Sequence, residues 1–184
     1  MKKVELKGKR ITLRCPRISD AKELMKHINN KEINRFLSTP TPVSFKKEIK
    51  WIKDCKKNWS KGKEYNFVIV LYKNNQVIGS TSLLRINTEQ KNSEIVTWIT
   101  KEFWGKGINN EAKKLLLDFG FKKLKLHRIC AKIITKNTMS VKAVQKFGFK
   151  KEGTERESFQ KKGKYYNVHY YGLLKDEWLK RNKK

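Results

Sequence analysis

The segment "EFWGKGINNEA" (residues 102–112) has the glycine spacing of a main-chain anion site. Gly105 and Gly107 let the backbone take positive φ and approach a ligand closely. The amides that would then point outward, at the start of a helix, are those of Lys106, Gly107, Ile108 and Asn109. Such amides and the helix dipole together stabilise a phosphate group. The same glycines could equally form a plain strand-to-helix turn, so this segment alone leaves both interpretations open.

Two nucleotide-binding motifs do not fit this segment. A Walker loop requires Lys-Ser or Lys-Thr after its last glycine, and neither pair follows Gly107. A dinucleotide fingerprint requires a third glycine three residues later, where Asn110 stands. The glycine turn therefore indicates an anion without identifying it.

Periodicity along the chain predicts the elements that must hold this turn. Strands are expected at residues 10–15, 65–72, 76–86, 93–100, 127–134, 147–159 and 164–174. Helices are expected at residues 19–28, 44–60, 107–119 and 137–146, and a short polar tail ends the chain. Trp51 and Trp59 share the apolar face of the second helix and are expected in the core.

The order of these elements, β-α-α-β-β-β-α-β-α-β-β, defines the expected fold class. Antiparallel strands come first, and a β-α-β crossover occupies the second half of the chain. We expect a single α+β domain over residues 1–184, in which helices flank a mixed central β-sheet.

Three blocks of the sequence resemble the GNAT acetyltransferase superfamily, and in particular its ribosomal-protein N-acetyltransferase group. "WGKGINNEA" is similar to that group's phosphate-binding loop, with Trp104 at the usual Gln or Arg position and Gly107 as the central glycine. Asn109 departs from the pattern, where Gly or Ala is normal. "NTMSVKAVQKFGFKKEG" resembles the N-x-x-S…GF-x-x-EG block, and "VHYYGLLKDEW" resembles the last strand and tail. The blocks occur in the expected order, and the resemblance covers roughly residues 76–178.

This resemblance implies the acyl-CoA N-acyltransferase fold, with acetyl-CoA as cofactor and CoA as product. Loop amides would hold the pyrophosphate, and Asn137 would bind the pantetheine arm. Backbone groups of the strand before the loop would pair with the same arm. The residues so assigned to the cofactor are Trp98, Ile99, Thr100, Trp104, Gly105, Lys106, Gly107, Ile108, Asn109, Asn137 and Ser140.

The resemblance also assigns two residues to the chemistry. Amine acetylation needs a neutral amine, a polarised thioester carbonyl and a proton for the departing thiolate. Related enzymes use a serine equivalent to Ser140 or, more often, a tyrosine four residues later, where this chain has Val144. Ser140 could instead cap its helix together with Asn137. Glu94 resembles the proposed general base, and its alternative role is an exposed carboxylate at a strand edge.

Composition constrains the partners of the protein. The net charge is +28, and 37 of the 45 basic residues are Lys. The charge could meet nucleic acid or an acidic protein, concentrate an anionic cofactor, or reflect a lysine bias. Three widely spaced cysteines and three scattered histidines favour a reducing cytosol and no metal site. With no long apolar run, we expect a cytoplasmic protein without a membrane anchor.

The predicted reaction transfers an acetyl group from acetyl-CoA to a primary amine by direct attack in a ternary complex. The preferred acceptor is a protein N-terminal α-amine, presented on an acidic or RNA-rich body such as the ribosome. A polyamine or an aminoglycoside is the alternative, but the charge would repel such polycations, because the 17 Asp and Glu residues are expected to be dispersed. A non-catalytic nucleic-acid-binding protein would leave the glycine turn unexplained. The enzyme could act as a monomer or a homodimer.

Overall fold

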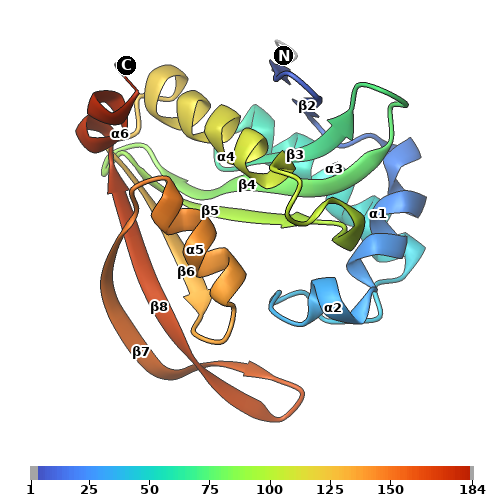
Figure 1. Ribbon diagram of the computed structural model, residues 1–184. Coiled ribbons are helices and arrows are strands. Elements are labelled where there is room, and N and C mark those ends of the chain that lie inside the picture. Colours follow the sequence, from blue (N-terminus) through green and yellow to red (C-terminus); the bar gives the residue numbers. More distant parts are fainter. Residues whose placement is uncertain (1–3, 183–184) are drawn as a thin grey trace.

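The computed structural model describes residues 4–182, in which eight strands form one sheet (Figure 1). The strands are β1 (Leu6–Lys7), β2 (Ile11–Arg14), β3 (Tyr65–Leu71), β4 (Val77–Asn87), β5 (Asn92–Ile99), β6 (Arg128–Ile134), β7 (Lys150–Lys161) and β8 (Lys164–Leu174). They lie in the order β1-β2-β3-β4-β5-β6-β8-β7. Only β5 and β6 are parallel neighbours; the other pairs are antiparallel. The mixed central sheet and the α+β class are confirmed.

Helices cover both faces of this sheet. They are α1 (Ala21–Ile28), α2 (Lys31–Asn34), α3 (Phe45–Ser60), α4 (Ile108–Asp118), α5 (Thr138–Lys146) and α6 (Lys175–Arg181). Leu24 of α1 and Ile52 of α3 pack on one face, against Val68 of β3. Leu116 of α4 and Val144 of α5 belong to the larger core on the other face. The sheet therefore separates a smaller core, next to α1 and α3, from a larger core, next to α4, α5 and α6.

The parallel pair β5–β6 is short. Only three residue pairs connect the two strands, from Asn92 with Arg128 to Glu94 with Cys130. Beyond Glu94 the strands diverge, and a gap opens in the middle of the sheet (Figure 1). We call this opening the β5–β6 gap. Since α4 follows β5 and α5 follows β6, both helices begin at the carboxyl ends of the diverging strands, where α/β proteins commonly bind ligands.

Three elements were not predicted from the sequence. β1 and α2 have only two and four residues, too few for a periodic pattern. The prediction that a short polar tail ends the chain is wrong, because residues Lys175–Arg181 form the helix α6. The Trp178 side chain is buried there, and its indole donates a hydrogen bond of 3.1 Å to Asp118. A single large aromatic side chain thus docks an otherwise charged helix onto the core.

The first predicted helix begins differently from the expectation. Its first turn, Ile18–Asp20, is a 3-10 helix that precedes α1. Asp20 does not cap α1 with its side chain. Its carboxylate instead accepts two hydrogen bonds, of 2.7 and 2.8 Å, from the Arg14 guanidinium. This ion pair ties the helix start to β2.

Among residues 4–182, none of the helices has both the length and the apolar character needed to cross a membrane. The same residues contain no group of three or more His, Cys, Asp or Glu arranged to hold a metal ion.

Candidate active site

The glycine turn has the backbone conformation that the sequence predicts. Gly105 and Gly107 have φ of 73° and 76°, in the left-handed region that favours glycine, and Gly107 is the N-cap of α4. Within residues 4–182, the amides of Gly107, Ile108 and Asn109 donate to no protein acceptor. The Lys106 amide makes only a long contact of 3.4 Å with the Phe103 carbonyl. A helix start with several uncommitted amides fits a pyrophosphate group.

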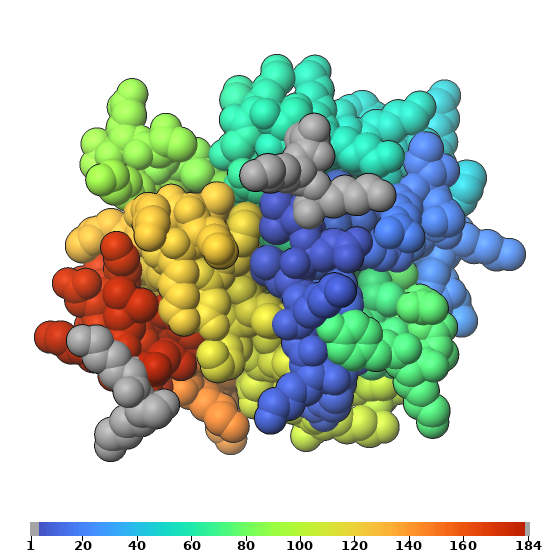
Figure 2. All heavy atoms as spheres, turned by 90° about the horizontal axis from the view of Figure 1, so that it is seen from above, coloured from blue at the N-terminus to red at the C-terminus, as the bar shows by residue number. Residues whose placement is uncertain are grey.

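Side chains from distant segments brace this turn. The Trp104 indole donates to the Ile99 carbonyl at 2.8 Å, so Trp104 fastens the turn to the end of β5. Arg10, at the start of β2, donates to the Lys106 carbonyl at 2.9 Å. The Arg10 amide and Nε also donate to Glu111 of α4, at 2.8 and 3.0 Å. In Figure 2 the blue N-terminal segment lies against the yellow surface of α4.

These contacts change the acidity of Glu111. Burial alone would raise its pKa, but hydrogen bonds from the Arg10 amide and guanidinium and from the Lys9 amide outweigh this effect. The pKa of Glu111 therefore lies below its usual range. The charged carboxylate is the form that holds Arg10 against the turn.

Asn109, which departs from the family pattern, carries an unsatisfied group. Its side-chain Oδ1 is buried and has no hydrogen-bond partner among the described residues. A buried carbonyl without a donor costs about 1–3 kcal/mol. Its backbone amide, however, is as free as those of the two residues before it. The departure thus affects the stability of the turn and leaves its main-chain donors in place.

The end of β5 requires one correction to the predicted cofactor contacts. The Thr100 amide donates to the Ile78 carbonyl of β4 at 2.8 Å, and the Thr100 carbonyl accepts from Phe103 at 3.0 Å. The Thr100 amide is therefore committed to β4, and the Trp98 amide points the same way, so neither amide is free to donate to the pantetheine arm. Because alternate amides of a strand point in opposite directions, the amides of Ile99 and Thr97 point toward the β5–β6 gap. The sequence analysis did not identify Thr97 as a cofactor contact, because the sequence does not show which alternate amides of β5 face β4 and which face the gap.

The start of α5 separates two roles that the sequence left open. The Asn137 side chain caps the helix by accepting from the Ser140 amide at 3.2 Å. Within residues 4–182 no hydrogen bond engages the Ser140 hydroxyl, so the expected joint capping by both side chains does not occur. Val144, at the position where relatives often carry a tyrosine, is buried in the core. Ser140 thus keeps a free hydroxyl at a helix N-terminus.

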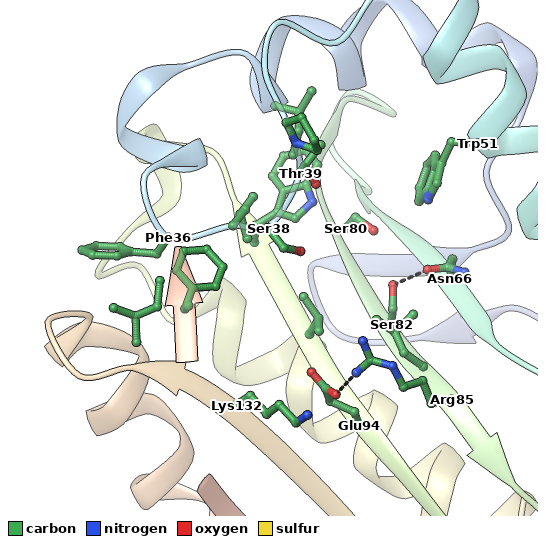
Figure 3. Close-up of a pocket in the computed structure, with 18 of the residues that line it drawn as sticks. Phe36, Ser38, Thr39, Trp51, Asn66, Ser80, Ser82, Arg85, Glu94 and Lys132 are labelled. Carbon is green, nitrogen blue, oxygen red and sulfur yellow. Dashed lines mark hydrogen bonds and ion pairs between the residues drawn. The ribbon is translucent and has the colours of Figure 1, made fainter. Parts of the chain in front are cut away.

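On the opposite face of the sheet from α4 and α5 lies a cavity of about 850 Å³ (Figure 3). Strand alternation separates the two faces, because Ile95 and Ile99 of β5 belong to the core whereas Glu94 and Trp98 line the cavity. The other lining side chains come from the end of α1, the α2–α3 segment, α3, the residue before β3 and strands β3 to β8. They include Phe36, Leu37, Glu48, Trp51, Glu64, Asn66, Ser82, Arg85, Lys132, Glu155, Phe159 and Tyr170.

Glu94 lies on β5, beside the β5–β6 gap, and points into this cavity. Its side chain is 12% exposed, and its strand lies between β4 and β6. The alternative role of an exposed edge carboxylate is therefore wrong. Arg85 forms an ion pair and a hydrogen bond with one Glu94 oxygen (Figure 3). The other oxygen has no partner in residues 4–182, and it is the atom that could accept a proton.

The expected dispersal of acidic residues is also wrong. Four glutamates, Glu48, Glu64, Glu94 and Glu155, line this one cavity. They come from α3, the segment before β3, β5 and β7, so no local pattern predicts their convergence. A hydrogen bond with Glu155 raises the pKa of Tyr170 to about 12. The cavity thus gathers four of the acidic residues, and Lys47, Arg85 and Lys132 line it as well.

Trp51 also differs from its expected position. Trp59 is buried in the core as predicted, whereas Trp51 is only partly buried: it packs against the small core and also lines the cavity. Trp98, Phe36 and Phe159 also line the cavity, so it has apolar side chains as well as carboxylates. Helical periodicity places both tryptophans on one face of α3 and cannot show which part of that face is covered.

Comparison with known proteins identifies the family. Residues 10–150 match the family described as acetyltransferase (GNAT) domain. The chain belongs to the GNAT acetyltransferase family. The acetyltransferase is 34% identical to the uncharacterized N-acetyltransferase p20 of Bacillus licheniformis over 172 residues, 92% of this chain and 95% of p20.

Two further relatives bear on the cofactor and the acceptor. YdaF of Bacillus subtilis, provisionally named a ribosomal N-acetyltransferase, is 35% identical over 100 residues, 54% of this chain and 55% of YdaF. A Vibrio cholerae spermidine N-acetyltransferase was solved in complex with CoA and spermine. It is 26% identical, has a TM-score of 0.83, and covers 92% of this chain and 98% of its own. The enzyme is accordingly an acetyl-CoA-dependent N-acetyltransferase.

Proposed function

We propose that the acetyltransferase binds both substrates together, with acetyl-CoA reaching the acceptor cavity through the β5–β6 gap. The position of this gap carries the proposal. On one side of it lie the starts of α4 and α5, with their free amides and the Ser140 hydroxyl. On the other side lies the cavity that contains Glu94. An acceptor amine in the cavity could thus attack the thioester directly.

The residues that would hold the cofactor follow from this placement. The amides of Lys106, Gly107, Ile108 and Asn109 would bind the pyrophosphate, supported by Gly105 and Trp104. The amides of Thr97 and Ile99 and the side chain of Asn137 would bind the pantetheine arm, beside Trp98. When bound, acetyl-CoA supplies an activated acetyl group as a thioester. Each of these contacts positions that group, and none requires a side chain to change its charge.

Two side chains would move protons during the reaction. Glu94 would accept a proton from the acceptor amine, through the oxygen that Arg85 leaves free. Ser140 would donate a proton to the CoA sulfur, where the N-terminus of α5 also stabilises negative charge. An α-amine with a pKa near 8 is about one-tenth neutral at pH 7, so a modest base is sufficient for it.

For the acceptor, we propose the N-terminal α-amine of a protein, with a ribosomal protein as the first choice. The apolar side chains that line the cavity suit the side chain of a first residue, and the carboxylates suit its amine. The charge of +28 favours approach to an acidic or RNA-rich body. The resemblance to YdaF supports the same choice. Such an acceptor would place the reaction in the cytoplasm.

A polyamine or an aminoglycoside is the second candidate. The observation that favours it is the convergence of four glutamates, which supplies the local acidity that a polycation needs. The relative solved with CoA and spermine supports this alternative.

One assay separates the two candidates. Release of free CoA thiol would be measured with acetyl-CoA and a panel of N-terminal peptides, spermidine and kanamycin. We expect the highest kcat/KM with a peptide. Turnover confined to spermidine or kanamycin would contradict the protein acceptor and favour the second candidate. Absence of acetyl-CoA binding in isothermal titration would contradict the proposed cofactor site itself.

A further inference from the structure

The acceptor cavity contains an acidic region that is separate from Glu94. It consists of Glu48 of α3, Glu64 before β3, Asn66 of β3 and Ser82 of β4, and we call these four residues the distal subsite. Figure 3 shows Asn66 and Ser82 to one side of the Arg85–Glu94 pair. The proposed chemistry at Glu94 gives these residues no role.

Glu48 is the residue in this subsite that most needs a partner. Its side chain lines the cavity, yet the residue is only 7% exposed. Among residues 4–182, no cation and no hydrogen-bond donor contacts its carboxyl group. Burial raises the pKa of Glu48 to about 7. A buried carboxyl group without a partner is unfavourable, and a bound cation would compensate it.

The Glu64 carboxylate is held in place by hydrogen bonds from neutral side chains. Its Oε2 accepts from the side-chain amides of Asn58 and Asn66, at 3.1 and 3.4 Å. The Asn66 carbonyl oxygen in turn accepts from the Ser82 hydroxyl at 2.8 Å. These hydrogen bonds fix the position of the carboxylate without neutralising it. No basic side chain of the described part of the chain pairs with Glu64.

The strand register gives the distance between this subsite and the reaction centre. Asn66 lies opposite Ser82, and Ser82 lies opposite Val96, two residues from Glu94 on the same face of β5. Two strand spacings separate β3 from β5, which is about 10 Å. Glu94 is also displaced by two residues, about 7 Å, along β5, so a ligand that touches both regions must carry two groups roughly 12 Å apart.

We infer that the distal subsite binds a second cationic group of the acceptor, while its reacting amine lies at Glu94. This inference rests on the proposed amine acetylation and specifies which amines are preferred. The second group is an ammonium or guanidinium roughly 12 Å from the reacting nitrogen. A linear diamine or polyamine carries such a group, and so does a peptide with a basic side chain close to its N-terminus.

The experiment compares acceptors that differ only in the second cation. One series runs from diaminopropane to diaminododecane, with monoamines of equal length as controls. A second series contains N-terminal peptides in which Lys replaces Ala at one later position. We expect kcat/KM to rise when the second cation is far enough from the reacting amine to reach the distal subsite. The rise should occur in the diamine series if the acceptor is a small molecule, and in the peptide series if it is a protein.

Variants test whether Glu48 is responsible. Glu48→Gln should lower kcat/KM about tenfold for the preferred dication, as expected for loss of one charge-assisted contact, and leave monoamine turnover unchanged. Glu89→Gln removes the same charge from an exposed turn and should change neither. Acetyl-CoA affinity, measured by isothermal titration, should be the same in all three proteins and reports on correct folding.

Two results would overturn the inference: equal kcat/KM for monoamines and dications in the unmodified enzyme, or an equal loss for both in Glu48→Gln. If no amine is acetylated, dication binding to the CoA complex would be measured directly, and its absence would also overturn the inference. Failure of the unmodified enzyme to bind acetyl-CoA would instead refute the proposed function.

Discussion

The glycine turn and the cavity that contains Glu94 lie on opposite faces of one sheet and are built from different kinds of groups. The turn offers main-chain amides, and its shape depends on Gly105 and Gly107 and on the start of α4. The cavity offers side chains from α3, the α2–α3 segment and six strands. Many side chains can change without altering a main-chain site, whereas each substitution in the cavity changes its chemistry. The first region is therefore suited to an invariant cofactor and the second to a variable acceptor.

The largest effect is expected where the two regions meet, at Ser140. Ser140→Ala should lower kcat about 100-fold, because it removes the proton donor for the CoA sulfur. The Kd for acetyl-CoA should stay the same, since Asn137 still caps α5 by accepting from the main-chain amide of residue 140. The rate of CoA thiol release measures kcat, and isothermal titration measures the Kd for acetyl-CoA. Met139→Ala, at an exposed neighbour, is the control, and full turnover by Ser140→Ala would remove this residue from the mechanism.

The backbone character of the turn can be tested at Gly107. Gly107→Ala should weaken acetyl-CoA binding roughly tenfold, because an L side chain at φ of 76° costs about 1–2 kcal/mol and displaces the amides. The control is Gly62, at the end of α3, which has φ of 63° and no atom within 4 Å of the position that a Cβ would take. Gly62→Ala should lower stability similarly without changing acetyl-CoA affinity. An equal loss of affinity in both variants would show that general destabilisation, not the turn, is responsible.

The side-chain character of the cavity can be tested through Lys161, at the tip of the β7–β8 hairpin. Its Nζ donates to the Asn34 carbonyl at 2.7 Å and to the Leu37 carbonyl, and so holds the segment that lines the cavity. Lys161→Met should raise the acceptor KM about fivefold, an effect of about 1 kcal/mol, and leave acetyl-CoA affinity unchanged. Lys161→Arg should restore part of the loss. Lys162→Met, at the adjacent exposed turn, should have no effect on KM.

A smaller effect is expected from the ion pair that braces the turn. Because the folded-state pKa of Glu111 is below its unfolded value, its stabilising effect is complete above the ordinary Glu pKa of about 4.3 and is lost as the pH falls through the folded value. Glu111→Gln should lower the Tm by about 2–4 °C at pH 7, and this difference should vanish in acid. Thermal unfolding between neutral and acid pH tests both statements. A pH-independent difference would mean that packing rather than charge is responsible.

The smallest effect, and one of opposite sign, is expected at Asn109. Asn109→Ala removes the buried Oδ1 that lacks a donor and should raise the Tm by about 2–4 °C, equivalent to about 1 kcal/mol. Acetyl-CoA affinity should not fall, because the main-chain amide remains. Asn110→Ala is the matched control at the next position. A weaker affinity in Asn109→Ala would show that the side chain itself contacts the cofactor.

The same contrast explains which parts of the site can be predicted from sequence. The conformation of Gly105 and Gly107 and the capping of α5 by Asn137 depend on a few consecutive residues, and both were predicted. The convergence of Glu48, Glu64 and Glu155 with Glu94 depends on how α3, β5 and β7 pack, and no local pattern contains that information. The sequence could not show that the amides of Trp98 and Thr100 face β4, because the register of β5 against β4 decides which amides of β5 are free.

The β5–β6 gap has a consequence for the stability of the protein, which should depend on the concentration of acetyl-CoA in the cell. Among residues 4–182, the main-chain groups of β5 beyond Glu94 pair with no residue of β6, so a cofactor bound as proposed would complete the sheet there. A ligand that binds only the folded chain stabilises it by about 2.7 kcal/mol at a hundredfold excess over Kd. We therefore expect a high concentration of acetyl-CoA to protect this enzyme from proteolysis, and a low concentration to shorten its half-life.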